Sequence, residues 1–368
     1  FRIVVVFFVN RCGIENWKYH GLFNWRVDMV NIGVIGIGFM GTTHFIAIQD
    51  IPDAKVTAIC TRDAKKLSGD WRAIKGNFGS GGGVQDLTGI RTYREIDDVL
   101  NDPNVDLIDI CLPTGMHYDI TMKALATGKH VLLEKPIALK LEEADEMVAA
   151  AKATGKHLMV GQVLRYFPEF AFLKDAVDDG RYGRFLGLHM KRVISKPLWG
   201  SGDWFKKYED TGAAGIDLHI HDTDFVQYLL GMPDRVHSSG MVSPNGYVLY
   251  LSTQYGYDGR DFTITAQSGS IGTAGLTFEH GYDAYFEEGT LWFNSLSGHP
   301  VTLYTPDGKE SPEINYPEAF TAEISYAVDC LNQGVEPEIL SGESARDSLL
   351  ICLKESESVK TGKTVEIR

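Results

Sequence analysis

The stretch GVIGIGFMG at residues 33–41 restricts the possible folds of this chain more than any other feature. A short, apolar, β-branched run ends in three glycines, Gly36, Gly38 and Gly41, and a helix-like pattern follows. In such a unit the first glycine permits the tight turn, the second lets backbone approach a pyrophosphate, and the third lets helix pack on strand. The phosphates then sit at the positive N-terminus of the helix. Alone, this spacing also occurs in ordinary glycine-rich turns.

The segments around the glycine turn strengthen the dinucleotide interpretation. An apolar strand at residues 54–60 encloses the turn in a strand–helix–strand unit of the length that a parallel sheet needs. Helical and strand patterns then alternate at residues 93–100 (helix), 105–112 (strand), 117–127 (helix) and 130–133 (strand). Repeated β, α, β order predicts an α/β fold with a doubly wound parallel sheet. We therefore assign residues 29–150 to an NAD(P)-binding Rossmann domain, with a flexible, glycine-rich insertion at residues 70–89.

The end of the second strand bears on the choice between NAD and NADP. An acidic residue usually binds the ribose 2′-hydroxyl there, but this sequence has Thr61 and Arg62. A hydroxyl beside a guanidinium can accept a 2′-phosphate, so the sequence admits either cofactor. Alternatively, Arg62 is a solvated residue at a helix start and Asp63 is the carboxylate of that helix N-terminus. Phe39 and Met40, between the glycines, complete the predicted cofactor contacts of the turn.

Two sets of polar residues directly follow predicted strands, where ligands bind in sheets of this kind. In LPTGMH, Pro113 stops the strand and is followed by Thr114 and His117. In LLEKP, Glu134 and Lys135 leave the strand before a proline, at the same sheet edge as the glycine turn. We predict that all five residues line the cofactor site. An ammonium fixed there can stabilise a developing alkoxide and hold a substrate oxygen, whereas an isolated lysine is more often a surface charge.

The second half of the chain alternates apolar with polar residues between turn residues, which is typical of an antiparallel sheet. The segments are LGLHMKRVI, YVLYLSTQYG, DFTITAQSG, LTFEHG, GTLWFNS and VTLYTP. Their aromatic residues are more typical of a core or a subunit interface than of a substrate site, and a self-complementary sheet face would produce homo-oligomers. Helical patterns at residues 318–331 and 345–358 close the substrate-binding and oligomerisation domain that we assign to residues 151–368.

The stretch GIDLHIHDTDF, at residues 215–225, places two histidines and three aspartates among aliphatic side chains. Ionisable groups in such surroundings cost desolvation energy unless they are paired or hydrogen-bonded, so this density requires an explanation. If residues 214–230 form one helix, Asp217, His221 and Asp224 share a face. One face of the predicted helix therefore holds an acid, an imidazole and a second acid.

His219 would project away from that face. A metal site would need His219 and His221 together on an extended strand, and the acid of such a signature would then fall at Thr223, which carries no carboxylate. We therefore expect no metal ion. A purely structural ion pair or helix cap is an alternative for the whole stretch, and Asp224 is expected to orient or anchor the helix.

We predict acid/base chemistry for this stretch. Oxidation of an alcohol removes a hydroxyl proton as hydride leaves the same carbon, and an imidazole with a near-neutral pKa suits this transfer. His221 is then the general acid/base, Asp217 hydrogen-bonds the substrate or the base, and Lys135 polarises the reacting oxygen. Arg165 and Trp204 are candidates for substrate contact, through hydroxyl binding and ring stacking, and structural packing is an equally good alternative for both.

In this order, GVIGIGFMGTTH, LPTGMH, LLEKPIAL and GIDLHIHDTDFVQYLLG resemble the glucose-fructose oxidoreductase, inositol dehydrogenase and rhizopine-catabolism (Gfo/Idh/MocA) superfamily over residues 29–368. The resemblance implies a Rossmann domain, a C-terminal α/β domain with an open, mostly antiparallel sheet, and homodimers or homotetramers formed through that sheet. It also implies oxidation or reduction of a sugar, anhydrosugar or cyclitol, and Lys135, Asp217 and His221 match the catalytic residues of the superfamily. Its members often have a small residue where His219 stands, which implies a narrowed sugar pocket or an additional donor.

Composition argues against several other partners. Lys and Arg total 35 against 49 Asp and Glu, and the net charge of -14 would repel nucleic-acid phosphates and anionic membranes. The five cysteines are scattered without a CxxC pair, so a disulfide framework or structural zinc site is not indicated, and a reducing cytoplasm suits them. Residues 1–28 are interpreted as an extension of unknown role. Their apolar run at residues 3–9 is too short to span a bilayer, although a signal-like anchor is an alternative.

Two rival functions are compatible with the same motifs. One is an NAD-dependent glycosidase that oxidises its substrate only transiently, and it would show no net nicotinamide reduction. The other is a dinucleotide-binding regulator without catalysis. The presence of Lys135, Asp217 and His221 argues against a regulator, because a sensor has no need of a base.

Overall fold

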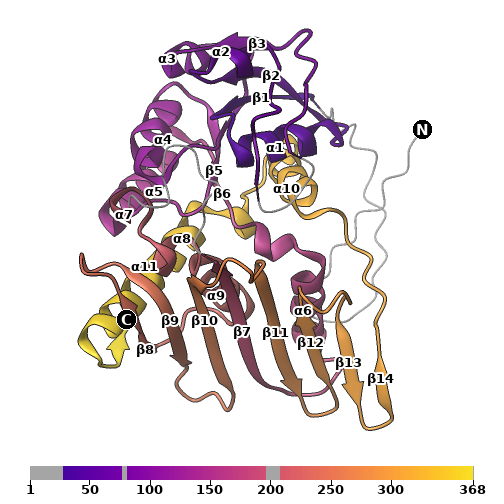
Figure 1. Ribbon diagram of the computed structural model, residues 1–368. Helices are drawn as coiled ribbons and strands as arrows, with labels where there is room; N and C mark the ends of the chain where they lie inside the picture. The colour runs from indigo at the N-terminus through magenta and orange to yellow at the C-terminus, as the bar shows by residue number, and fades with distance from the viewer. Residues whose placement is uncertain (1–27, 77–80, 196–207, 368) are drawn as a thin grey trace.

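The computed structural model describes residues 28–76, 81–195 and 208–367, which form two domains (Figure 1). The first domain contains a parallel sheet of six strands in the order β3-β2-β1-β4-β5-β6. Its strands are β1 (Val30–Ile35), β2 (Ala54–Cys60), β3 (Arg91–Tyr93), β4 (Leu107–Ile110), β5 (His130–Glu134) and β6 (Leu158–Gly161). Its helices are α1 (Phe39–Gln49), α2 (Ala64–Leu67), α3 (Ile96–Leu100), α4 (His117–Ala126) and α5 (Leu141–Thr154). The strand order reverses between β1 and β4, which places the ligand crevice of such a sheet beyond the carboxyl ends of these two strands.

Three sequence predictions about this domain need correction. The predicted helix at residues 93–100 begins only at Ile96, because Tyr93 pairs with Cys60 as the last residue of β3. The predicted boundary at residue 150 falls inside α5, and β6 beyond it completes the parallel sheet. The insertion at residues 70–89, where it is described, is partly ordered, since Trp71 is fully buried against Phe45.

The second domain contains a sheet of nine strands in the order β14-β13-β12-β11-β7-β10-β9-β8-β15. The strands are β7 (Phe185–Ser195), β8 (Arg235–Val242), β9 (Val248–Gly256), β10 (Thr263–Gly272), β11 (Glu279–Phe286), β12 (Thr290–Asn294), β13 (Thr302–Thr305), β14 (Gly308–Glu310) and β15 (Val365–Glu366). Among these described strands only β7 and β10 pair in parallel, as a mostly antiparallel sheet requires. The sequence analysis missed β8, whose apolar residues are few because much of the strand is exposed.

The helices of the second half of the chain pack partly on the large sheet and partly on the first domain. They are α6 (Pro168–Asp179), α7 (Tyr208–Thr211), α8 (Ala214–Asp217), α9 (Ile220–Leu230), α10 (Ala319–Gln333) and α11 (Gly342–Thr361). Helices α6 and α9 pack on the large sheet in one core cluster. Helix α10 returns to the first domain, where Phe320, Ile324 and Val328 share a core with β1 and α1 (Figure 1). The domains therefore share packing and are not separable at one point in the chain.

The predicted single helix at residues 214–230 is two helices. Helix α8 ends at Asp217, α9 begins at Ile220, and His219 is the N-cap residue of α9. The break changes the directions of the side chains around it, so the shared face predicted for Asp217, His221 and Asp224 does not form. As shown below, these residues have different partners.

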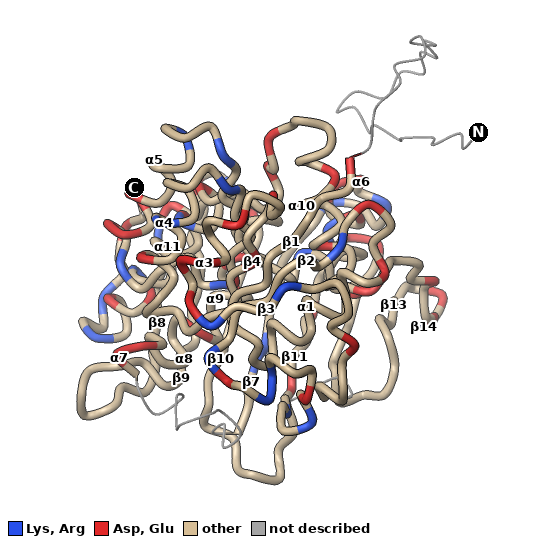
Figure 2. The backbone as a smooth tube through the Cα atoms, turned by 90° about the horizontal axis from the view of Figure 1, so that it is seen from above, with Lys and Arg blue, Asp and Glu red and all other residues tan. Residues whose placement is uncertain are grey.

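Figure 2 shows Lys and Arg interspersed with Asp and Glu over both domains. In the described part of the chain, no helix is long and apolar enough to cross a membrane.

Candidate active site

The glycine turn has the geometry that a dinucleotide cradle needs. Gly36 has φ +96°, and a Cβ there would lie 2.5 Å from the carbonyl oxygen of Cys111. A Cβ on Gly41 would lie 2.1 Å from the carbonyl oxygen of Gly36, so the close packing of α1 on β1 requires glycine. A Cβ on Gly38 would meet nothing within 4 Å. Space is therefore open in front of Gly38, at the N-terminus of α1, where a pyrophosphate would lie.

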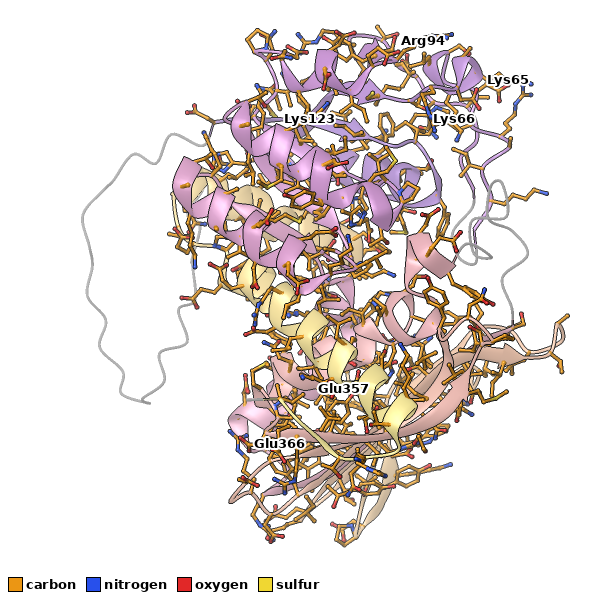
Figure 3. The ribbon with its side chains drawn as sticks, turned by 90° about the vertical axis from the view of Figure 1, so that its left-hand side faces the viewer. Lys65, Lys66, Arg94, Lys123, Glu357 and Glu366 are labelled. Carbon is orange, nitrogen blue, oxygen red and sulfur yellow. The ribbon has the colours of Figure 1, made fainter. Side chains whose placement is uncertain are left out.

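The end of β2 carries basic residues near this cradle. Asp63 caps α2 by accepting a 2.9 Å hydrogen bond from the backbone N–H of Lys65. This is the alternative in which Asp63 is the carboxylate of a helix N-terminus. Arg62 is exposed, and Lys66 donates a 2.6 Å hydrogen bond to the carbonyl oxygen of Ile37 inside the glycine turn. Figure 3 shows Lys65 and Lys66 together in the first domain, at the opposite end of the molecule from Glu357 and Glu366. Lys66 was not predicted from the sequence as a cofactor-site residue, although it lies in the first helix after β2.

His117 links the segments that follow β4 and β5, and both of its ring nitrogens are already hydrogen-bonded. Its Nδ1 lies 2.8 Å from the carbonyl oxygen of Pro136, and its Nε2 lies 2.8 Å from that of Leu112. Burial lowers the pKa of His117, so the neutral ring donates to one of the two carbonyls. The predicted cofactor contact of this side chain is thus corrected to a structural role. Pro113 is exposed at the end of β4, while Thr114 is buried.

A buried imidazole between two acids lies beneath the cradle. Nδ1 of His44, on α1, lies 3.1 and 3.0 Å from the two carboxylate oxygens of Asp109 on β4. Its Nε2 lies 3.1 Å from Glu134, close enough for an ion pair but poorly aligned for a hydrogen bond. Burial alone would lower the pKa of His44, but Asp109 and Cys111 raise it well above the usual value. The imidazole is therefore a cation that offsets part of the negative charge of Asp109 and Glu134.

This arrangement changes the role of Glu134. Its carboxylate is buried, is paired with His44 and accepts a 3.1 Å hydrogen bond from the backbone N–H of Lys135. Glu134 thus positions the backbone of Lys135, and its direct contact with the cofactor stays a prediction. His44, Asp109 and Cys111 also offer atoms within 4.8 Å of one another, a spacing that metal ligands adopt. In this structure those atoms are already used by the imidazole–carboxylate contacts.

Lys135 and Asp217 come into contact across the two domains. Nζ of Lys135 donates to the backbone carbonyl of Asp217 at 2.7 Å and to its carboxylate at 3.2 Å. The two side chains are 16% and 20% exposed, so the pair is shielded but still open to a ligand. An ammonium has three N–H donors, and Asp217 uses two of them. One donor of Lys135 is left for another oxygen.

His221 lies close enough to this pair to respond to its charge. Burial, and then the charges of Lys135 and Arg192 and the neighbouring His280, hold the pKa of His221 well below its usual value. The ring is therefore neutral at neutral pH. His221 has no hydrogen-bond partner among the described residues and is partly exposed, unlike the ionisable residues that follow it in α9. The near-neutral pKa expected for this base is thus not found in the structure. The neutral, unpaired imidazole is still able to accept a proton from a hydroxyl bound at the ammonium of Lys135.

The other ionisable residues of this stretch face the interior. His219 is fully buried between Ser268 and Glu355, at 2.7 and 3.2 Å, so it neither narrows the pocket nor acts with His221 on a metal. Asp224 is bound by Arg165, with Nε to Oδ2 at 2.8 Å and Nη2 to Oδ1 at 2.6 Å. This agrees with the expectation that Asp224 anchors the helix.

Arg165 has a structural position. Besides Asp224 it donates to the carbonyl oxygen of Ile339 and to Ser344, and it is 4% exposed. Four of its five N–H donors are thereby used, which corrects the prediction that it contacts substrate and favours the packing alternative. Trp204 lies outside the described residues.

Comparison with known proteins identifies the family. Residues 30–162 match the family model described as an oxidoreductase family with an NAD-binding Rossmann fold, and residues 170–291 match the Gfo/Idh/MocA C-terminal domain. The chain belongs to the Gfo/Idh/MocA oxidoreductase family. This confirms the family, the α/β fold with its two sheets, the oxidoreductase class and the nicotinamide cofactor predicted from the sequence.

Curated relatives of this Gfo/Idh/MocA protein extend over nearly its whole length. It is 28% identical over 353 residues to scyllo-inositol 2-dehydrogenase (NAD(+)) of Bacillus subtilis (strain 168), covering 92% of this chain and 96% of that protein. It is 25% identical to myo-inositol 2-dehydrogenase of Thermotoga maritima, covering 92% and 98%. The solved structure of levoglucosan dehydrogenase in complex with NADH and L-sorbose has the same fold, with a TM-score of 0.77, 19% identity, and coverage of 93% and 99%.

Proposed function

We propose that this protein is an NAD(P)-dependent dehydrogenase or reductase that transfers hydride between nicotinamide and a hydroxyl-bearing carbon of a sugar, anhydrosugar or cyclitol. The contact between Lys135 and Asp217, with an unpaired His221 beside it, carries the proposal. The names of the inositol dehydrogenase relatives agree with this substrate class.

The residues of this chain supply the proton transfer. A bound nicotinamide accepts or donates the hydride. In the oxidative direction, neutral His221 accepts the hydroxyl proton while the remaining donor of Lys135 holds the same oxygen, and the carbon–oxygen double bond forms as hydride leaves the carbon. Asp217 keeps the ammonium in place through two hydrogen bonds. Glu134 supports it from the other side by binding the backbone of Lys135.

The cofactor is NAD or NADP. The open space at Gly38 suits the pyrophosphate of either. No carboxylate is available at the end of β2 to bind a ribose diol, because Asp63 caps α2, and the exposed Arg62 stands where a 2′-phosphate would lie. Arg62→Glu should therefore weaken NADP binding and leave NAD binding little changed, as measured by titration of protein fluorescence.

The assembly is proposed to be a homodimer or homotetramer formed through the large sheet. Apolar side chains are exposed on its strands, among them Met241, Ile271, Tyr285 and Tyr304. Light scattering coupled to size-exclusion chromatography tests this, and a monomer at micromolar concentration would contradict it. We also propose a cytoplasmic location, because the described cysteines Cys60, Cys111, Cys330 and Cys352 are all free thiols.

The decisive experiment is an absorbance screen of sugars and polyols for net reduction of NAD and NADP. His221→Ala should abolish turnover and keep the cofactor affinity. Lys123→Ala is a matched surface control, because Lys123 is paired only with the exposed Asp97. Undiminished turnover of His221→Ala would remove the assigned base. Product formation without net nicotinamide reduction would favour the transient-oxidation glycosidase instead.

A further inference from the structure

Two buried polar atoms near His221 have no hydrogen-bond partner among the described residues. One is Nη2 of Arg192 on β7, and the other is Nδ1 of His280 on β11. Arg192 and His280 are direct partners in the antiparallel pairing of these strands, so their side chains lie close together on the same face of the sheet. Neither residue takes part in the proton transfer derived above. Unpaired buried polar atoms cost free energy, so these two neighbouring atoms point to a ligand.

Arg192 is oriented by a chain of hydrogen bonds that leads into the interior. Its Nε lies 3.1 Å from both carboxylate oxygens of Asp222, and Asp222 accepts a 2.7 Å hydrogen bond from Ser268. Because Ser268 donates to Asp222, its oxygen accepts from Nδ1 of His219 at 2.7 Å, and His219 is held in turn by Glu355 on α11 at 3.2 Å. This chain fixes the Nε side of the guanidinium. The neighbouring Nη2 is left without a partner, in a direction that the Nε contact defines.

Aromatic rings lie beside Arg192 and His280. The guanidinium carbon of Arg192 lies 5.7 Å from the ring centroid of Phe278. The ring of His280 packs against Phe278 and Phe293, with centroids 5.1 and 5.6 Å apart. Arg192 is 4% exposed, whereas His280 and Phe278 are partly exposed. The rings exclude water from the guanidinium, which strengthens its interaction with any charged group that reaches it.

Positive charges near His221 and His280 lower the pKa values of both imidazoles. Burial and then Arg192 lower the pKa of His280 to about 3. Burial, followed by Lys135, Arg192 and His280, likewise keeps His221 neutral by lowering its pKa. Asp217, bound to Lys135, and Asp222, bound to Arg192, offset part of these positive charges, but the pKa values of both imidazoles are still lowered. An anion near these rings would therefore be stabilised.

We propose that Arg192 and His280 bind a carboxylate of the substrate, which is therefore an acidic sugar such as a hexuronate. The inference rests on the proposed function, since it places this carboxylate at the far side of a substrate whose reacting carbon lies at His221 and Lys135. A carboxylate carries one charge and accepts several donors, which matches the unpartnered Nη2 of Arg192 and the imidazole of His280. Lys135 and Arg192 each already have one carboxylate partner, so a singly charged group suits this site better than a dianionic phosphate.

Matched substrates test this proposal directly. D-Glucuronate and D-galacturonate differ from D-glucose and D-galactose only by a carboxylate in place of a hydroxymethyl group. For the full-length enzyme we expect kcat/KM to be about tenfold or more higher for each acid than for its neutral counterpart, since a hydrogen bond to a charged group is worth at least this factor. Calorimetry with enzyme saturated in reduced cofactor should show the same preference in Kd.

Variants at two neighbouring positions of β7 separate specificity from stability. Arg192→Gln should lower kcat/KM for the acids by about 10²-fold and for the neutral sugars by less than about threefold. Arg192→Lys keeps a positive charge and should restore part of the preference. Lys191→Gln is the control, because Lys191 lies on the opposite face of the strand, where it pairs at 2.8 Å with Glu279 at the surface. It should change neither value.

The outcomes distinguish failure of the carboxylate inference from failure of the proposed function. Equal or better use of the neutral sugars by the wild-type enzyme overturns the carboxylate inference and leaves the oxidoreductase function standing. If the acids bind in a way that depends on Arg192 but no hydride is transferred, the carboxylate site is supported and the proposed function is overturned. Failure of the acids to bind, or an equal loss on acids and neutral sugars in both Arg192 variants, overturns the inference. Tighter binding of hexose phosphates than of hexuronates also overturns it.

Discussion

Replacement of Lys135 by Met tests the electrostatic link between the two domains. Lys135 lies at the end of β5, and its charge is, after burial, the first contribution that lowers the pKa of His221. A nearby like charge disfavours the charged form of an imidazole. Because Lys135 is paired with Asp217 and is 16% exposed, part of its charge is compensated. We therefore expect the pKa of His221 to rise in Lys135→Met, by less than the removal of an unpaired ammonium would cause.

The sign follows from the charge. An ammonium disfavours a second positive charge, so its removal makes protonation of His221 easier, and the ring becomes protonated at higher pH. The acid-side limb of the kcat/KM profile should move to higher pH by the same amount, on a turnover reduced by about 10²–10³-fold through loss of the oxygen contact. NMR titration of labelled histidine rings measures the pKa even without activity. Lys140→Met is the control, because Lys140 pairs at 2.6 Å with Glu143 on the surface. An unchanged or lower pKa of His221 in Lys135→Met would refute the reasoning.

Three further predictions concern the parts of the molecule that hold this site. Asp224→Asn removes the charge that pairs with the buried Arg165, and urea denaturation should show a loss of about 3–5 kcal/mol in unfolding free energy; a loss below about 1 kcal/mol would contradict a tightly coupled pair. Gly41→Ala places a Cβ 2.1 Å from the carbonyl oxygen of Gly36, so fluorescence titration should show cofactor affinity reduced by about tenfold or more; unchanged affinity would mean that the turn tolerates the shift. His44→Gln removes a group whose pKa is raised by folding. The stability that the wild-type ion pair adds should be fully present below about pH 6.5 and be lost as the pH rises through the raised pKa, and a pH-independent difference between wild type and variant would speak against a charged His44.

Most of the first domain could be predicted because its signals are local. The glycine spacing and the apolar run of β2 gave an element whose bounds, Ala54–Cys60, agree with the structure. Strand β3 was missed because three residues are too few for a periodic pattern. The boundary at residue 150 was misplaced because nothing in the sequence of α5 marks the return of the chain to the parallel sheet. The pairing of β6 with β5 depends on tertiary contacts, which local sequence patterns do not show.

The buried part of the site was less predictable. Lys135 and Asp217 are 82 positions apart, and each was found from its own context, a strand end and a dense polar stretch. The ion pairs of His44 were not found, because its partners come from two other elements. A signal was present nonetheless. Asp109 interrupts the apolar strand VDLIDICL, and a carboxylate at a position buried on both faces needs a cationic or hydrogen-bonding partner.

The stretch GIDLHIHDTDF contains both residues that stabilise the fold and a residue that is available for catalysis. The break between α8 and α9 separates Asp217 from the rest, and successive residues of α9 point in different directions around its axis. Asp222 and Asp224 each bind a buried arginine, and His219 binds Glu355, so these three groups offset the cost of their own burial. His221 alone in this fully described stretch has an ionisable side chain without a hydrogen bond or ion pair. Because a folded protein rarely leaves such a group unpaired unless a ligand or reaction uses it, His221 is better explained by chemistry than by packing.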